Sequence, residues 1–204
     1  MNILVVAATE NEVRETMDRT FSSKNVQFLI TGVGMVATTF SLTEKLGKEQ
    51  FDLIINAGLA GSFSPVIAIG ETVIVKHDVF SELGAQDHND FIPIERLGLN
   101  SDSVIYPLAF SKVIPSTLKK VKGITVNTIH GNEDSISTIK KRLQPNIESM
   151  EGAAVFFVCN RYLIPCIQIR TISNYVERRN KDKWNIPMAI KNLNTNLTDV
   201  INSL

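Results

Sequence analysis

The sequence predicts an α/β fold: one three-layer domain with a mixed, mainly parallel central sheet and helices on both faces. Three observations lead to this prediction. Short runs rich in Ile and Val alternate along the chain with longer helical segments. The strand-like runs are almost entirely apolar, as expected for strands that are covered on both faces. No linker, repeat or shift in composition divides the 204 residues, so we expect a single domain over residues 1–204.

The elements follow from the apolar runs and the turn signals between them. Strands are predicted at residues 3–8, 26–31, 53–56, 71–79, 124–129 and 166–172. Helices are predicted at residues 10–20, 36–48, 115–121, 134–143, 152–162 and 187–203. The segment 81–106 is the least regular, and long connections of this kind usually border a site.

The charge balance limits the partners. The chain carries 21 Lys and Arg residues against 21 Asp and Glu residues, a formal net charge of zero, which argues against a nucleic-acid partner. The first apolar run is too short for a signal peptide, and no run approaches the ~20 residues of a membrane span. We therefore expect a cytoplasmic protein with no nucleic-acid and no membrane partner.

The cysteines and histidines show no catalytic or metal-binding spacing. Cys159 and Cys166 form no Cys-x-x-Cys pair, so we interpret both as small buried apolar residues. His77, His88 and His130 lie at no metal-ligand spacing and beside no nucleophile, which favours structural or surface roles. No metal and no cofactor are expected.

Candidate site residues are sought directly after the strands, because ligands of α/β sheets bind at the carboxyl ends of their strands. Thr9-Glu10-Asn11-Glu12 follows the first strand. Thr-x-x-Glu is a capping box that satisfies free amides at a helix start. Alternatively, Glu12 faces the sheet edge and deprotonates a water molecule. The spacing alone favours the cap.

The second motif is Gly32-Val33-Gly34-Met35-Val36-Ala37, which matches the dinucleotide-binding fingerprint. A dinucleotide site also needs an acidic residue at the far end of the next strand. Asp52 precedes that strand and so lies at the wrong end. A tight turn that lets the backbone approach a ligand at Gly34 is the better interpretation.

The third motif is a stretch of small residues, 56–62, that we interpret as a loop after the strand 53–56. Small residues allow the backbone to come within hydrogen-bonding distance of a ligand, whereas the simpler alternative is a flexible turn. Two glycine-bearing loops after neighbouring strands favour the ligand. The residues expected near it are Ala57, Gly58, Ala60 and Gly61.

Two further motifs carry polar side chains. Met150 and Glu151 precede a predicted helix, where a carboxylate favours the helix dipole or, alternatively, accepts both hydroxyls of a ribose. Ser173 and Asn174 end the last strand-like run. They suit a turn, or an amide that pairs with adjacent donor and acceptor atoms of a heterocycle. The spacing leaves both alternatives open.

Taken in order along the chain, these motifs resemble the nucleoside phosphorylase and nucleosidase family. The resemblance covers essentially the whole chain. Within the family, Ser149–Ala154 and the segments after Ser173 are similar to the futalosine hydrolase branch. The motifs that carry it are Ala7–Val13, Gly32-Val33-Gly34, Asn56–Gly61, Gly70-Glu71-Thr72-Val73, Ser149–Ala154 and Arg170–Asn174.

The resemblance implies roles for the candidate residues. Glu12 would hold the attacking water, Met150 and Glu151 the ribose, and Asn174 with Ser173 the base. Adenine-specific members carry Asp where this chain has Asn174. An amide pairs with O6 and with a protonated N7 of a 6-oxopurine, so hypoxanthine is the implied base. Because an amide does not titrate, Asn174 is excluded as a general acid.

The implied reaction is hydrolysis of the N-ribosidic bond of futalosine, which releases hypoxanthine and dehypoxanthine futalosine in menaquinone biosynthesis. Phosphate as the nucleophile would need cations near the glycine motifs, and residues 31–37 and 53–63 contain neither Arg nor Lys. Water is therefore favoured. The alternatives are a purine nucleoside phosphorylase, a methylthioadenosine-type nucleosidase, or a non-catalytic nucleotide-binding module built on Gly32-Val33-Gly34.

The resemblance also implies partners. These are a small-molecule nucleoside, water and further copies of this chain, as a dimer or larger homo-oligomer. Futalosine carries a carboxylate beyond its ribose, for which we expect a basic partner from Arg178, Arg179 or the connection 81–106. The alternative for the basic cluster around Arg178 is a solvated loop.

Overall fold

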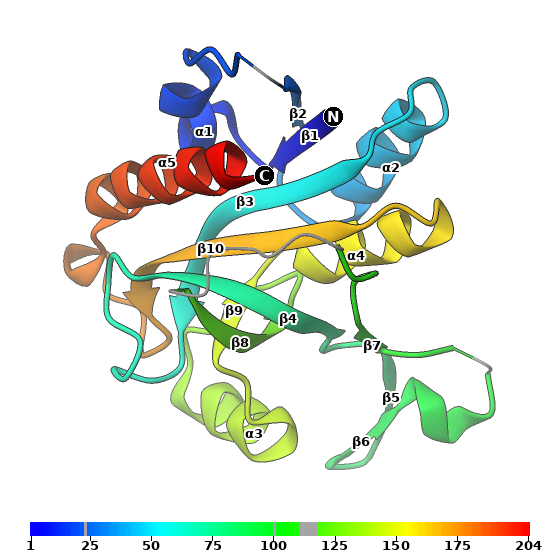
Figure 1. The fold of residues 1–204 in the computed structure, drawn as a ribbon. Coiled ribbons are helices and arrows are strands. Elements are labelled where there is room, and N and C mark those ends of the chain that lie inside the picture. Colours follow the sequence, from blue (N-terminus) through cyan, green and yellow to red (C-terminus); the bar gives the residue numbers. More distant parts are fainter. Residues whose placement is uncertain (23, 100, 111–117) are drawn as a thin grey trace.

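The sheet is the centre of the fold. In the computed structural model, which describes residues 1–22, 24–99, 101–110 and 118–204, eight strands form one sheet (Figure 1). A separate hairpin consists of β5 (Gly84–Asp87) and β6 (Asp90–Pro93). The strands of the sheet are β1 (Asn2–Ala7), β2 (Asn25–Ile30), β3 (Leu53–Ser62), β4 (Thr72–Phe80), β7 (Val104–Ile105), β8 (Lys119–Thr125), β9 (Ile147–Ser149) and β10 (Cys166–Tyr175).

The strand order is β10-β4-β8-β9-β3-β1-β2, with β7 beside β4. Strand β10 also pairs with β3, so five strands (β3, β10, β4, β8 and β9) close into a ring. Strands β1, β2, β3 and β10 run parallel, as do β4, β8 and β9. The pairs β4/β10, β3/β9 and β4/β7 are antiparallel. The predicted mixed, mainly parallel sheet is confirmed.

Helices cover both faces of the sheet, and the alternation of side chains along β1 shows why. Ile3 and Val5 pack with apolar residues of α1 (Glu10–Met17) and α5 (Ile186–Ser203). Leu4 and Val6 point the other way, toward α2 (Met35–Leu46) and α4 (Gly152–Arg161). Successive strand residues face opposite sides, so a fully apolar strand needs a helix layer on each side. Helix α3 (Glu133–Leu143) packs on a third, smaller cluster.

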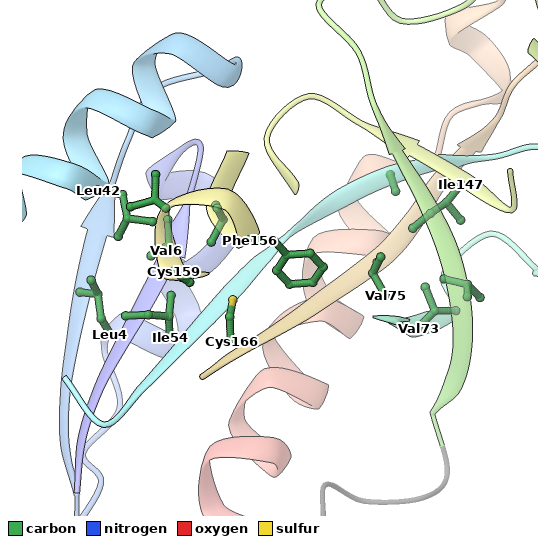
Figure 2. Packing of buried hydrophobic residues seen from close by; sticks show 14 of the residues in the cluster. Leu4, Val6, Leu42, Ile54, Val73, Val75, Ile147, Phe156, Cys159 and Cys166 are labelled. Atoms are coloured by element: carbon green, nitrogen blue, oxygen red, sulfur yellow. The ribbon is translucent and has the colours of Figure 1, made fainter. Parts of the chain in front are cut away.

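Figure 2 shows the larger apolar cluster, with Phe156 and Cys159 of α4 and Cys166 of β10 pointing into it. Both cysteines are buried and unpaired, as the sequence predicts. Burial raises the pKa of the Cys166 thiol well above its usual value. No helix within the described ranges is long and apolar enough to cross a membrane.

The structure corrects several predicted elements. Residues 57–62 continue strand β3 instead of forming a loop, and β10 extends three residues past its predicted end, to Tyr175. Strand β8 begins at Lys119, five residues before its predicted start, and ends at Thr125. The helix predicted at residues 115–121 is wrong over 119–121, which belong to β8, and residues 115–117 lie outside the described part. Pairing with β4 holds this segment in the sheet.

Candidate active site

A cavity of about 380 Å³ lies at the carboxyl ends of the parallel strands β1, β3 and β10. This is the position and the size expected of a small-molecule site. It brings together seven of the ten predicted site residues. These are Glu12, Ala60, Gly61, Met150, Glu151, Ser173 and Asn174.

The other three predicted residues do not line the cavity. Gly34 reaches the site through its backbone N–H, which donates to Glu151 Oε1 at 3.0 Å. Ala57 is buried in the apolar cluster beneath α1 and α5. Gly58 lies under the Arg170 guanidinium.

Glu12 both caps α1 and lines the cavity. Its Oε2 accepts hydrogen bonds from the backbone N and the hydroxyl of Thr9, both at 3.0 Å. Its Oε1 accepts from the backbone N of Leu59 on β3, also at 3.0 Å. The capping interpretation is therefore correct, and the same contacts orient the carboxylate at the cavity wall.

Glu151 is the residue before α4 and is buried. Oε1 accepts from Gly34, whose φ of 94° is a conformation that favours glycine. Oε2 lies 3.9 Å from Nη1 of Arg170. The carboxylate thus joins the turn after β2 to α4 and β10. The preceding residue, Met150, lines the cavity beside it.

The small residues predicted to form a loop belong to strand β3. Their small size leaves space for neighbouring side chains. A Cβ at Gly58 would overlap Nη1 of Arg170 and would lie 3.1 Å from Glu12 Oε1. A Cβ at Gly61 would lie 2.9 Å from Val176 Cγ2 and 3.2 Å from Asn174 Nδ2. The glycines therefore allow the site side chains of α1 and β10 to lie directly against the strand.

The Asn174 amide is held in a defined orientation. The Ser173 hydroxyl donates to Asn174 Oδ1 at 2.8 Å, and Asn174 Nδ2 donates to the Tyr175 carbonyl at 3.1 Å. An amide has two N–H donors and two lone pairs on its oxygen. One donor and one lone pair therefore remain to bind a ligand in the cavity.

Arg170 brings a positive charge to the site that the sequence analysis missed. The residue is only 2% exposed, and its Nη1 lies against Gly58 and 3.9 Å from Glu151 Oε2. Among the described residues, its Nε and Nη2 have no hydrogen-bond partner. The available signal was a single charged residue in a strand-like run, but the direction of its side chain depends on the pairing of β10 with β3.

His130 and Glu148 form a pair of contacting side chains that the sequence did not predict. A structural or surface role was favoured for His130. Glu148 Oε2 lies 2.6 Å from His130 Nδ1, and Oε1 accepts from the His130 backbone N at 3.0 Å. Both residues line the cavity. They are 18 residues apart, and no spacing rule would have joined them.

The basic residues proposed for a substrate carboxylate are separated by the fold. Arg179 lines the cavity, with its guanidinium 5.2 Å from the centre of the Trp184 ring. Arg178 lines separate surface grooves. None of the described residues of the connection 81–106 lines the cavity. In the described ranges, no group of three His, Cys, Asp or Glu side chains is arranged to hold a metal ion.

Comparison with known proteins places the chain among phosphorylase-like proteins. A family model described as "Phosphorylase superfamily" matches residues 7–202. A futalosine hydrolase of Acidothermus cellulolyticus is 29% identical over 81% of this chain and 70% of its own length. A 5'-methylthioadenosine/S-adenosylhomocysteine nucleosidase of Buchnera aphidicola is 25% identical over 93% of this chain and 91% of its own.

A solved structure shares the fold. The futalosine hydrolase of Helicobacter pylori superposes with a TM-score of 0.83 at 16% identity, covering 100% of this chain and 98% of that one. The likeness supports the architecture described above. The named relatives include both futalosine hydrolases and adenine-nucleoside nucleosidases, so similarity alone does not choose the base.

Proposed function

The chain belongs to the phosphorylase superfamily, and on that premise we propose that it hydrolyses the N-ribosidic bond of futalosine and releases hypoxanthine. The observation that carries the choice of base is the Asn174 amide at the cavity wall, oriented by Ser173. With one donor and one acceptor free, it matches O6 and a protonated N7 of a 6-oxopurine. The reaction would belong to the futalosine route of menaquinone biosynthesis.

The carboxylates of Glu12 and Glu151, each held by backbone hydrogen bonds, support hydrolysis. Breaking the bond between C1′ and the base nitrogen develops positive charge on the sugar and negative charge on the base. Glu12, fixed by Thr9 and Leu59, would take a proton from the attacking water. Glu151 would accept hydrogen bonds from the ribose hydroxyls, with Met150 packed against the sugar. No covalent intermediate is needed.

Arg179 is proposed to bind the carboxylate that futalosine carries beyond its ribose, because Arg179, unlike Arg178, lines the cavity. The substitution Arg179→Gln is expected to raise the KM for futalosine by about 5-fold, the effect of ~1 kcal/mol for a solvent-exposed ion pair. The KM for inosine, which lacks the carboxylate, should not change. Arg178→Gln is the matched control, and an equal rise for both substrates would remove Arg179 from this role.

A substrate panel tests the proposed function. The purified chain is incubated with futalosine, inosine and methylthioadenosine, with and without phosphate, and the released base and sugar are identified. We expect free hypoxanthine and free sugar at a rate independent of phosphate. Ribose 1-phosphate would indicate a phosphorylase, and preferred release of adenine would indicate a methylthioadenosine-type nucleosidase. Saturable NAD binding without base release would indicate a binding module.

A homo-oligomer is also proposed, as a dimer or larger assembly. Val36 and Phe40 on α2 are 82% and 70% exposed. Val33, just before α2, is also largely exposed and lines the cavity. Exposed apolar side chains grouped on one helix mark an interaction surface. Light scattering should give a mass above that of one chain, and Phe40→Asp should reduce it to that of a monomer.

A further inference from the structure

The proposed hydrolysis leaves one proton unassigned. When the bond to the ribose breaks, the electron pair stays on the base, and protonation of a ring nitrogen makes the base a better leaving group. Asn174 faces the base in the proposed binding mode, but an amide has no proton to give. A titratable group on the same part of the wall would supply this proton, and the following inference rests on the proposed function.

Three paired residues on neighbouring strands show which titratable group lies near Asn174. Gly61 of β3 is paired with Asn174 on β10 and with Glu148 on β9. Both neighbouring side chains lie on the face of the sheet to which a side chain at position 61 would point. A Cβ added to Gly61 would lie 3.2 Å from Asn174 Nδ2 and 3.6 Å from Glu148 Cγ. A base placed over Gly61 would therefore have Asn174 on one side and Glu148 on the other.

Glu148 does not itself present a free carboxylate to that space. The residue is 4% exposed, and both of its oxygens contact His130, one at the backbone N and one at Nδ1. A carboxylate oxygen 2.6 Å from Nδ1 accepts the proton of that nitrogen and orients the ring. Because His130 lines the cavity, the opposite nitrogen, Nε2, is the one that a bound base can reach.

The ring is also fixed by packing. Its centroid lies 6.2 Å from that of Phe63, in an edge-on arrangement. His130 is thus held on three sides, by the backbone hydrogen bond, the carboxylate and the aromatic ring. A donor held in this way loses little freedom when the substrate binds.

We propose that His130, oriented by Glu148, is the general acid of the reaction. As the C1′–N bond breaks, its electron pair moves to the base, and the proton on His130 Nε2 passes to a ring nitrogen of that base. The water attacks C1′ and gives its proton to Glu12. The products are neutral hypoxanthine and the free sugar, and a proton returns from Glu12 to His130 through solvent before the next turnover.

The other charged groups on the cavity wall are less suited to this step. Glu12 and Glu151 are held by backbone amides and are assigned to the water and the ribose. Glu177 and Arg179 also line the cavity. Glu177 is paired with Lys183 Nζ at 2.8 Å, and a guanidinium does not give up its proton. The competing explanation is that the His130–Glu148 pair only ties residue 130 to β9.

The test compares His130→Gln with His88→Gln, a matched change at a side chain that is 95% exposed. His130→Gln should lower kcat for inosine and futalosine by ~10²–10⁴-fold, the usual contribution of a general acid, with little change in KM. A 4-nitrophenyl riboside has a leaving group that needs no proton, so its cleavage should be nearly unaffected. His88→Gln should match the wild type on all three substrates.

The pH dependence gives a second measurement. In the wild type, kcat for inosine should fall as the pH rises and His130 loses its proton, whereas His130→Gln should lack this fall. Glu148→Gln, a positioning change, should lower kcat for inosine more than it lowers the cleavage of the nitrophenyl riboside, because the carboxylate no longer orients the ring. Glu177 and Arg179 are the other charged groups on that wall.

The outcomes separate the two proposals. If the wild type releases no hypoxanthine from either nucleoside, the proposed function fails. If it does, and His130→Gln keeps the wild-type rate and pH profile, His130 is not the acid. An equal loss of inosine and nitrophenyl riboside cleavage with an unchanged pH profile would show a structural role and would also overturn the inference.

Discussion

Two polar clusters each include residues of β10. One cluster faces the cavity, and the other is completely buried. The cavity cluster (Glu12, Glu151, Ser173 and Asn174) lines the cavity and retains hydrogen-bonding capacity on Asn174. The sealed cluster (Asp78, Thr125 and Gln168) is 0% exposed. There, Asp78 accepts from Thr125 Oγ1 and Val79 N at 2.9 Å and from Gln168 Nε2 at 3.0 Å. Access to the cavity distinguishes the two clusters: the free capacity of Asn174 opens into the cavity, whereas Gln168 Oε1, which has no partner among the described residues, is buried.

The sealed cluster nevertheless positions part of the cavity cluster. Thr125 Oγ1 accepts from the backbone N of Ala153 at 2.8 Å, in the first turn of α4. A Cβ at Gly152 would overlap Asp78 Oδ2, and one at Gly123 would lie 2.7 Å from it. The helix start that carries Glu151 is thereby fixed against β4 and β8. The comparison predicts that changes in the cavity cluster affect activity and that changes in the sealed cluster affect stability.

The largest effect is expected from Glu12→Gln in the cavity cluster. The amide oxygen can still accept from Thr9, whereas the NH₂ group cannot accept from Leu59 N, so the protein should fold with a modestly lower melting temperature. The general base is lost, so kcat for hypoxanthine release should fall by ~10²–10⁴-fold. Glu10→Gln, at an exposed position two residues earlier, serves as the control. Wild-type activity in Glu12→Gln would leave Glu12 with its capping role alone.

A smaller effect, on stability, is expected from Gln168→Leu in the sealed cluster. The change removes the donor to Asp78 Oδ2 and leaves a buried carboxylate oxygen unpaired, which costs about 1–3 kcal/mol of unfolding free energy. Urea denaturation measures the loss, with the exposed Gln50→Leu as the control. The kcat of the folded enzyme should change little; a loss of kcat as large as that of Glu12→Gln would contradict the division between the clusters.

The smallest effect is a change in the pH dependence of stability. Burial raises the pKa of the Asp78 carboxyl, against the opposing effects of its hydrogen bonds from Gln168 and Thr125 and of the Arg170 charge. A raised pKa in the folded state means that this group favours folding at low pH and that its contribution is lost as the pH rises through the folded-state pKa.

Asp78→Asn removes this titration, and the amide N–H₂ can pair with Gln168 Oε1, which has no partner among the described residues. Urea unfolding across a pH series should therefore show a shallower decline toward high pH in Asp78→Asn than in the wild type. Parallel curves for the two proteins would show that Asp78 does not titrate differently in the folded and unfolded states.

The apolar strands and most helices were predictable because their signals are local. The run at β1 is apolar on both faces, and α5 combines an apolar stripe with a proline in its first turn. The extension of β3 was not predictable, since Ala and Gly have low strand propensity. It is held by pairing with β10, from Cys166 to Tyr175. Strand β9 has three residues and forms only between β3 and β8.

The sequence by itself determined the fold class and the chain order of the site motifs, because alternating apolar runs and residues directly after strands are local features. Only the tertiary structure decided which polar groups meet. Glu148 joins His130, and Arg170 reaches Gly58 and Glu151, because strand register places residues far apart in sequence side by side. Exposure also differs along β10: Gln168 is fully buried, whereas Asn174 opens into the cavity.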